Sequence, residues 1–136
     1  MRRVLGLLSC AMAIFCVGCG EAKTFPVEGK VAFKDGSDAS ALEGSVVTFE
    51  SQEQKKSATG MVGADGTFKL STEVEGDGAV PGKHKVAITP KAAELDKPTP
   101  KPLFDSRYSD PTKSGIEVEV KKAKENPITI EVERAK

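Results

Sequence analysis

The sequence contains no tryptophan, one tyrosine and one histidine, and aromatic residues make up only 5% of its 136 positions. The single histidine, His84, rules out a metal site built from several imidazoles. The sequence also has no nucleophile-elbow motif and no glycine-rich phosphate loop. These absences predict a protein without metal, cofactor or enzymatic activity.

No excess of either charge is present, because 20 Lys and Arg residues balance 20 Asp and Glu residues. The two signs are interspersed along the chain, whereas a nucleic-acid-binding protein concentrates basic residues on one face. We therefore expect no nucleic-acid partner. Loss of Arg2 and Arg3 with a cleaved N-terminus would leave a net charge of about −2.

Cysteine is confined to the N-terminus, at positions 10, 16 and 19. Met1–Arg3 is a short basic segment, and the fourteen residues from Val4 to Val17 carry no charge. This apolar run is shorter than the roughly twenty residues of a membrane-spanning helix and has the length of a signal-peptide core. Residues 1–18 are therefore predicted to be a signal peptide.

The sequence Val17-Gly18-Cys19 closes that apolar run and resembles the lipobox of bacterial lipoprotein precursors. Position 16 is Cys where that family usually has Leu. The resemblance implies cleavage before Cys19 and attachment of membrane lipid to its thiol. The alternative is an ordinary signal peptide that leaves Cys19 as a free thiol, which is a liability in an oxidising compartment. Gly20 after the anchor further implies an outer-membrane location in the cell envelope.

The rest of the chain alternates apolar and polar residues with the period of two that is typical of β-strands. Turn signals such as Asp35-Gly36 and Asp65-Gly66 separate the alternating segments, and Asp65-Gly66 predicts a hairpin. No segment shows helical periodicity. Residues 19–24 would be a lipidated tether, and residues 25–136 one all-β domain, a seven-stranded antiparallel Greek-key sandwich. The seven predicted strands are 27–33, 45–50, 57–62, 67–72, 83–89, 116–120 and 128–133.

Apolar positions of these strands predict the core. We expect burial of Phe33, Val47, Phe49, Phe68, Val86, Ile88, Val118, Ile130 and Val132. His84 shares a strand face with Val86 and Ile88, which favours a packed imidazole. The proline-rich stretch 90–108 predicts an irregular connection that crosses from one sheet to the other.

The order of VEGKVAF, SVVTFE, GADGTFKL and PGKHKVAIT resembles carboxypeptidase regulatory-like domains, which are seven-stranded sandwiches of the transthyretin type. RYSDPTKSGIEVEV is similar to the following segment in small lipoproteins common in planctomycete bacteria. The resemblance covers about residues 25–133, although His84 stands where such domains more often carry Tyr. It implies a fold and a surface location, and most members have no established activity.

Three groups of polar residues are candidate sites. Arg107, Tyr108 and Asp110 form the densest polar-aromatic cluster, which is either an interaction surface or a structural contact beneath the long loop. The acidic turns at 35–38 and 65 lack the ligand spacing of an EF-hand calcium site. They are interpreted as residues that favour tight turns. The alternating glutamates are expected on outward strand faces, where they discourage edge pairing. These are Glu117, Glu119, Glu131 and Glu133.

Two functions remain open from sequence. The favoured one is a non-enzymatic, membrane-anchored envelope module that contacts an unknown envelope protein or glycan. The alternative is a carrier of small ligands or a transport accessory that uses the 90–108 loop as a lid. A core filled by side chains favours the first, and an apolar cavity of several hundred cubic ångströms favours the second.

Overall fold

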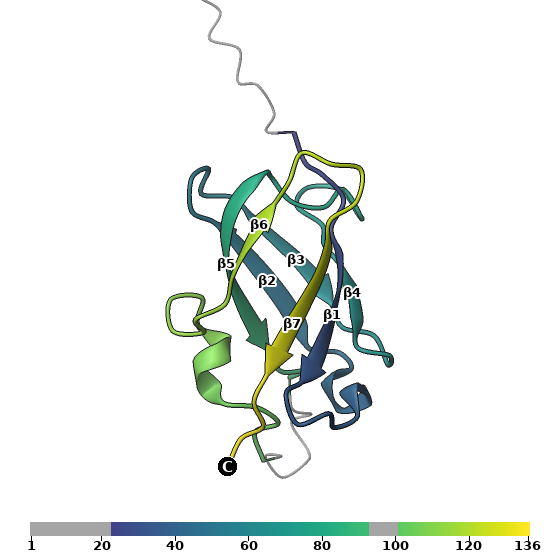
Figure 1. Ribbon diagram of the computed structural model, residues 1–136, viewed down its shortest axis with the longest axis vertical. Coiled ribbons are helices and arrows are strands. Elements are labelled where there is room, and N and C mark those ends of the chain that lie inside the picture. The colour runs from purple at the N-terminus through teal and green to yellow at the C-terminus, as the bar shows by residue number, and fades with distance from the viewer. Residues whose placement is uncertain (1–22, 93–100) are drawn as a thin grey trace, which may run out of the picture.

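Seven β-strands lie in two sheets, as Figure 1 shows for the computed structural model, which describes residues 23–92 and 101–136. One sheet has the order β4-β1-β7 and the other β3-β2-β5-β6. The predicted all-β sandwich of seven strands is therefore confirmed. The strands are β1 (Glu28–Phe33), β2 (Val46–Ser51), β3 (Ser57–Met61), β4 (Thr67–Lys69), β5 (Gly82–Thr89), β6 (Glu117–Val120) and β7 (Pro127–Val132).

Two short 3-10 helices close the end of the sandwich opposite to the entering chain. They are η1 (Ala39–Leu42) and η2 (Ser106–Ser109). Each begins at an aspartate whose side chain accepts a hydrogen bond from the backbone two residues later. This capping satisfies an otherwise free N–H group. Each helix then buries one large side chain, Leu42 or Tyr108.

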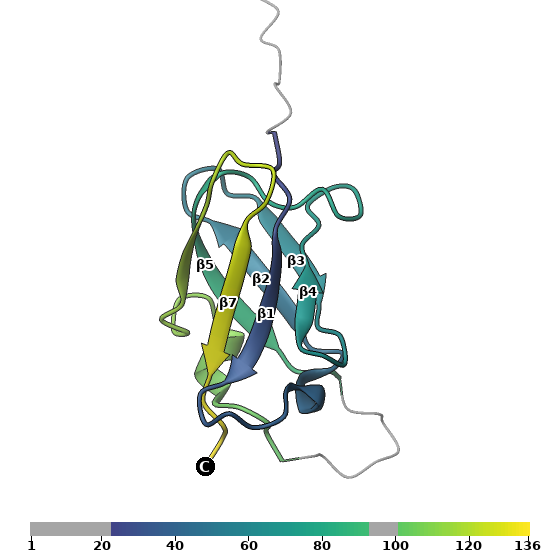
Figure 2. The same cartoon turned by 45° about the vertical axis from the view of Figure 1, so that its right-hand side comes forward.

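The strands are antiparallel to their neighbours with one exception, the pair of β1 and β7. These two strands run parallel, with Glu28 opposite Pro127 and Phe33 opposite Val132. The prediction of a wholly antiparallel sandwich is wrong for this pair. The chain enters β1 at the same end of the sandwich at which it turns from β6 into β7, so both strands run away from that end (Figure 2).

The hairpin predicted around Asp65-Gly66 forms only in part. The turn is present, because Gly66 N–H donates to Gly63 O at 3.0 Å and Gly66 has a φ of 82°. Thr59 and Ser71 also exchange two backbone hydrogen bonds. However, β3 and β4 belong to different sheets, because β4 pairs with β1 and places Phe68 in the core. The connection therefore joins the two sheets along one side.

The space between the sheets is filled by one cluster of eighteen buried side chains from the described residues. Eight of the nine residues predicted for the core are buried. The exception is Val118, which is half-buried and packs at the margin of the cluster. It lies in β6, an edge strand that has a neighbour on one side only. Apolar burial on this scale is the main stabilising force in such a domain.

The connection from β5 to β6 does not cross between the sheets, because these two strands are neighbours in one sheet. Part of it, residues 93–100, lies outside the described residues. Its later part is packed, since Phe104 and Tyr108 are both buried. Asp105 N–H donates to the Glu133 carbonyl at 3.3 Å, so the connection is fastened to the end of β7.

Candidate functional site

Two of the three residues predicted as an interaction surface meet at the end of the sandwich that carries η2. Tyr108 is only 2% exposed, and its ring packs edge-on to Phe104 with centroids 6.3 Å apart. Arg107 lies over the same ring, with 4.8 Å between its Cζ and the centroid. Its Nη2 also donates to the phenol oxygen at 2.9 Å. Tyr108 is thus a structural anchor, and Arg107 is the exposed member of the pair.

Glu133 connects this pair to Lys34, the residue that follows β1. Its Oε2 lies 3.1 Å from Nη2 of Arg107, and its Oε1 accepts a hydrogen bond from Lys34 Nζ at 2.9 Å. The hydrogen bond from Lys34, together with the positive charges of Lys34 and Arg107, lowers the pKa of the Glu133 carboxyl. These side chains are exposed, so the ion pairs fix the geometry more than they stabilise the fold.

A second guanidinium extends this surface. Arg134 lies over the ring of Phe33, with 4.4 Å from its Cζ to the centroid, and its Nε is 3.5 Å from Asp35. Lys34 and Arg107 thus pair with Glu133, and Arg134, the next residue, pairs with Asp35 at the same end of the molecule. We call Lys34, Arg107, Glu133 and Arg134 the distal surface. Its members are too distant in sequence for spacing alone to reveal them.

Asp110, the third predicted residue, does not join the distal surface through its side chain. Its Oδ1 accepts hydrogen bonds from the backbone N–H of Thr112 at 2.8 Å and from the Thr112 hydroxyl at 2.6 Å. Both hydrogen bonds lower the pKa of the Asp110 carboxyl. Asp110 also pairs with Lys113 at 3.5 Å. Its role is to organise the turn before β6.

His84 is buried in the core, as predicted, with 1% of its surface exposed. Its Nε2 lies 2.7 Å from the Val80 carbonyl, while Nδ1 has no hydrogen-bond partner. The ring packs against Phe49 at a centroid distance of 5.8 Å. Burial lowers the pKa of the imidazole, which favours the neutral form. These contacts define a structural histidine rather than an exposed proton donor.

The aspartates of the acidic turns accept hydrogen bonds from the backbone of the same turn. Asp35, Asp38 and Asp65 each accept an N–H hydrogen bond from the residue two positions later, at 2.9 to 3.1 Å. Their pKa values are lowered by hydrogen bonds from Ser37, Ser40 and Thr67 respectively. Within residues 23–92 and 101–136, no group of three or more His, Cys, Asp or Glu side chains is arranged to hold a metal ion.

The alternating glutamates lie on outward faces, as expected. Glu117, Glu119 and Glu131 are exposed, and Glu133 is held in the ion pairs of the distal surface. Glycoside hydrolysis requires two carboxyls that face each other across a cleft. The glutamates on these strands show no such arrangement in the described part of the chain.

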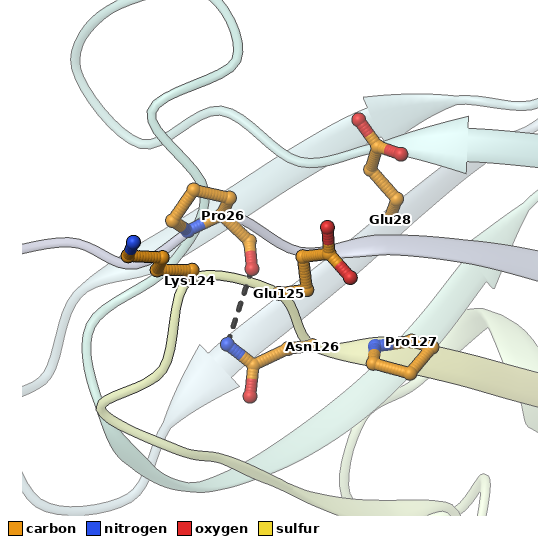
Figure 3. Close-up of a pocket in the computed structure, with 6 residues that line it drawn as sticks. All are labelled: Pro26, Glu28, Lys124, Glu125, Asn126 and Pro127. Atoms are coloured by element: carbon orange, nitrogen blue, oxygen red, sulfur yellow. Dashed lines mark hydrogen bonds between the residues drawn. The ribbon is translucent and has the colours of Figure 1, made fainter.

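A surface pocket of about 280 Å³ lies at the opposite end, where the chain enters the domain (Figure 3). It is lined by Pro26, Glu28, Lys124, Glu125, Asn126 and Pro127. The buried Asn126 builds its floor, because Nδ2 donates to the Pro26 carbonyl at 3.1 Å. Asn126 Oδ1 accepts from Lys121 N–H at 2.8 Å. One ammonium and two carboxylates at its rim suit a charged group rather than an apolar ligand.

Asn126 is not among the residues that the sequence pattern singled out. The hydrogen bond from Asn126 to the Pro26 carbonyl joins residues a hundred positions apart, and spacing along the chain does not reveal such a contact. Two larger surface pockets, of about 440 and 450 Å³, lie along β3 and β4 near Met61. Apolar side chains such as Met61 line them together with Lys69 and a glutamate, and both are open hollows at the surface, so neither encloses a ligand as a carrier cavity does.

The predicted lipid attachment site, Cys19, and the predicted signal peptide lie outside the described residues. Among the residues that are described, no helix has the length and apolar character needed to cross a membrane. Comparison with known proteins gives no match to a family profile, to a curated protein or to a solved structure.

Proposed function

We propose that this protein is a non-enzymatic lipoprotein of the cell envelope, tethered to a membrane through acylated Cys19. The N-terminal sequence carries the proposal: a basic start and an uncharged run of fourteen residues end at Cys19. Only four positions later the described chain begins at Lys23, and Phe25 already pairs with Ala79. Such a short tether suits a domain held close to its anchor.

The filled core supports an interaction module over a carrier of small ligands. Eighteen buried side chains occupy the space between the sheets, and the three pockets discussed above lie at the surface. A carrier needs a concave apolar site that encloses most of its ligand. The ligand-carrier function therefore stands second.

The distal surface is the proposed contact for an envelope protein or glycan. It lies at the end opposite to the entry of the chain, so a domain anchored at Cys19 would present it away from the membrane (Figure 1). Arginine is frequent at interface hot spots, and Arg107 is held in place by Tyr108 and Glu133. A preorganised guanidinium loses little side-chain freedom on binding.

Metabolic labelling with a radioactive fatty acid tests the anchor. We expect the full chain to incorporate the fatty acid and Cys19→Ala to incorporate none. The control is Cys16→Ala, which keeps a small residue before the cleavage point and should still be labelled. Label that persisted in Cys19→Ala would overturn the assignment. In a cell with two membranes, we expect the labelled protein in the outer-membrane fraction, and recovery only with the inner membrane would contradict that location.

Site-specific photo-crosslinking tests the distal surface. A photoreactive residue at position 107 is expected to capture an envelope protein or glycan in intact cells. The matched control is the same residue at position 117, where Glu117 is exposed on an outward strand face. Equal capture at the two positions would contradict a contact specific to the distal surface.

A further inference from the structure

Three connections meet at the end of the sandwich where the chain enters. Phe25 and Ala79 exchange backbone hydrogen bonds of 2.9 and 3.0 Å, which join the entering chain to the β4–β5 connection. Asn126 joins the β6–β7 connection to Pro26. Both views place these connections at the same end of the molecule (Figures 1 and 2). We call this end the proximal face.

One large apolar side chain on the proximal face is turned to solvent. Val74, in the β4–β5 connection, is 68% exposed, which is unusual beside a core whose valines are almost all buried. Among the described residues, Met61 is the one other large hydrophobic side chain with a similar exposure, 69%. It lies at the C-terminal end of β3, where the chain turns toward β4, and lines a surface pocket that Glu75 and Gly76 also reach.

The segment that carries Val74 is held in one conformation. The Asp77 carboxylate accepts hydrogen bonds from the backbone N–H groups of Thr72, Glu73 and Val74, at 2.6, 3.1 and 3.1 Å. Gly76 N–H donates to Ser71 Oγ at 2.8 Å. A connection fastened by these bonds keeps its apolar tip exposed instead of folding it onto the sheet. The exposure of Val74 is therefore a property of the folded loop.

Lysines lie on another connection of the proximal face, the one between β6 and β7. The β6–β7 connection contains Lys121, Lys122, Lys124 and one acidic residue, Glu125, and all four are exposed. Lys23 precedes the first bridge to the β4–β5 connection. In the β4–β5 connection, Glu73 pairs with Lys56, and the Asp77 carboxylate is turned toward three backbone N–H groups of its own loop. Glu75 remains as an exposed carboxylate.

The chain outside the described residues sets the distance of this face from an anchor. Cys19 precedes Lys23 by four positions, which span at most about 14 Å when fully extended. A lipid on Cys19 would thus hold the proximal face against the headgroup layer, whatever path those residues take. An apolar tip on a face that also carries lysines is the composition that binds at an anionic membrane interface.

From these observations we propose that the proximal face docks on an anionic lipid surface, with Val74 entering the headgroup region and the β6–β7 lysines contacting lipid phosphates. This inference rests on the proposed anchoring at Cys19. It adds an orientation of the domain relative to the membrane. The proximal face contacts the bilayer, and the distal surface points away from it.

The test couples residues 19–136 through the Cys19 thiol to a maleimide lipid in vesicles. This segment contains every described residue and one cysteine, and the chain has no tryptophan. Val74→Trp therefore gives a single fluorophore on the proximal face, and Met61→Trp is a control of matched exposure. On vesicles with phosphatidylglycerol, we expect blue-shifted emission and quenching by brominated lipid for Val74→Trp alone.

Charge is tested by replacing Lys121, Lys122 and Lys124 with Gln together in the Val74→Trp chain. Each lysine near an anionic surface contributes a partition factor of about five, so their loss should abolish most of the quenching. The control replaces Lys91, Lys101 and Lys113, which are exposed on the β5–β6 connection. Equal quenching at positions 74 and 61, no quenching at either, or no effect of the three β6–β7 substitutions would overturn the proposal.

Coupling Cys19 to a maleimide lipid attaches the domain to vesicles even if the cell does not acylate this residue, so the two proposals can be tested separately. Quenching at position 74 combined with no fatty-acid label on Cys19 in cells would refute the anchor while retaining the membrane-binding face. Label on Cys19 without quenching at position 74 would refute the orientation alone. Both tryptophan variants should unfold in urea with the midpoint of the parent chain, because neither site lies in the core.

Discussion

The backbone N–H of Glu133 donates a hydrogen bond to the phenol oxygen of Tyr108 at 3.3 Å. This contact fastens η2 to the residue that follows β7, and Arg107 donates to the same oxygen. The distal surface is therefore built on a buried side chain that comes from the β5–β6 connection. The position of Arg107 in the distal surface thus depends in part on the Tyr108 hydroxyl.

Replacement of Tyr108 by Phe should remove that acceptor and keep the packing. We expect a loss of about 1 kcal/mol in the free energy of unfolding, the usual net value of such a hydrogen bond. Urea denaturation of the two proteins measures it. Lys34→Ala is the control, because an exposed ion pair contributes little. Stability of Tyr108→Phe equal to that of the parent chain would show that the hydroxyl does not hold η2.

Replacement of Phe68 by Ala should destabilise the domain by about 3–5 kcal/mol, because it leaves a cavity in the core. Phe68 is 4% exposed, and its ring lies 6.2 Å from that of Phe49. Such a loss is comparable to much of the stability of a small domain. Denaturant unfolding measures it, with the exposed Met61→Ala as the control. An unchanged midpoint in Phe68→Ala would contradict the orientation of β4.

Acid should destabilise the fold in part through His84. Burial places the pKa of folded His84 below the ordinary value of 6.5, so the unfolded chain takes up the proton first. The stabilisation is fully present above about pH 6.5 and is lost as the pH falls through the folded pKa, by at most about 1.4 kcal/mol per pH unit.

Urea titrations between pH 7.5 and 5 measure this dependence. The replacement His84→Gln keeps a donor for the Val80 carbonyl and removes the titration, so its stability should fall less over this range. Carboxylates titrate in both proteins, and the difference between the two curves therefore isolates His84. Parallel curves would show that the pKa of His84 is the same in the folded and unfolded states.

Metal removal should leave the melting temperature unchanged. The carboxylates of Asp35, Asp38 and Asp65 already accept hydrogen bonds within their turns, which leaves them poorly placed to converge on an ion. A cation that bound only the folded state would raise the melting temperature by mass action. Thermal unfolding with EDTA and with added calcium measures this. A shift of several degrees would identify a calcium site in one of these turns.

Local patterns were sufficient to predict most strands, because alternation reports directly which side chains face the core. Val47, Phe49 and Ile130 are buried because they occupy the apolar positions of alternating strands, as predicted. Val118 shows where the pattern fails: alternation gives the face of a strand but not its place at the edge of a sheet. Only pairing across the sandwich decides that.

Long-range pairings could not be predicted from the sequence. Nothing local to β1 or β7 indicates that they lie side by side in parallel, and the same holds for the pairing of Glu133 with Lys34. The Asp65-Gly66 turn predicts a reversal of the chain but not that the second strand would join another sheet. The resemblance to carboxypeptidase regulatory-like domains stays a prediction.

The parallel pairing of β1 with β7 has a kinetic consequence. β1 is the first of the seven strands to be synthesised and β7 the last, so one edge of β1 has no native neighbour until all seven strands have been made. Contacts between such distant segments raise the relative contact order and slow folding. The sheet of β4, β1 and β7 therefore cannot be completed before the last strand has left the ribosome.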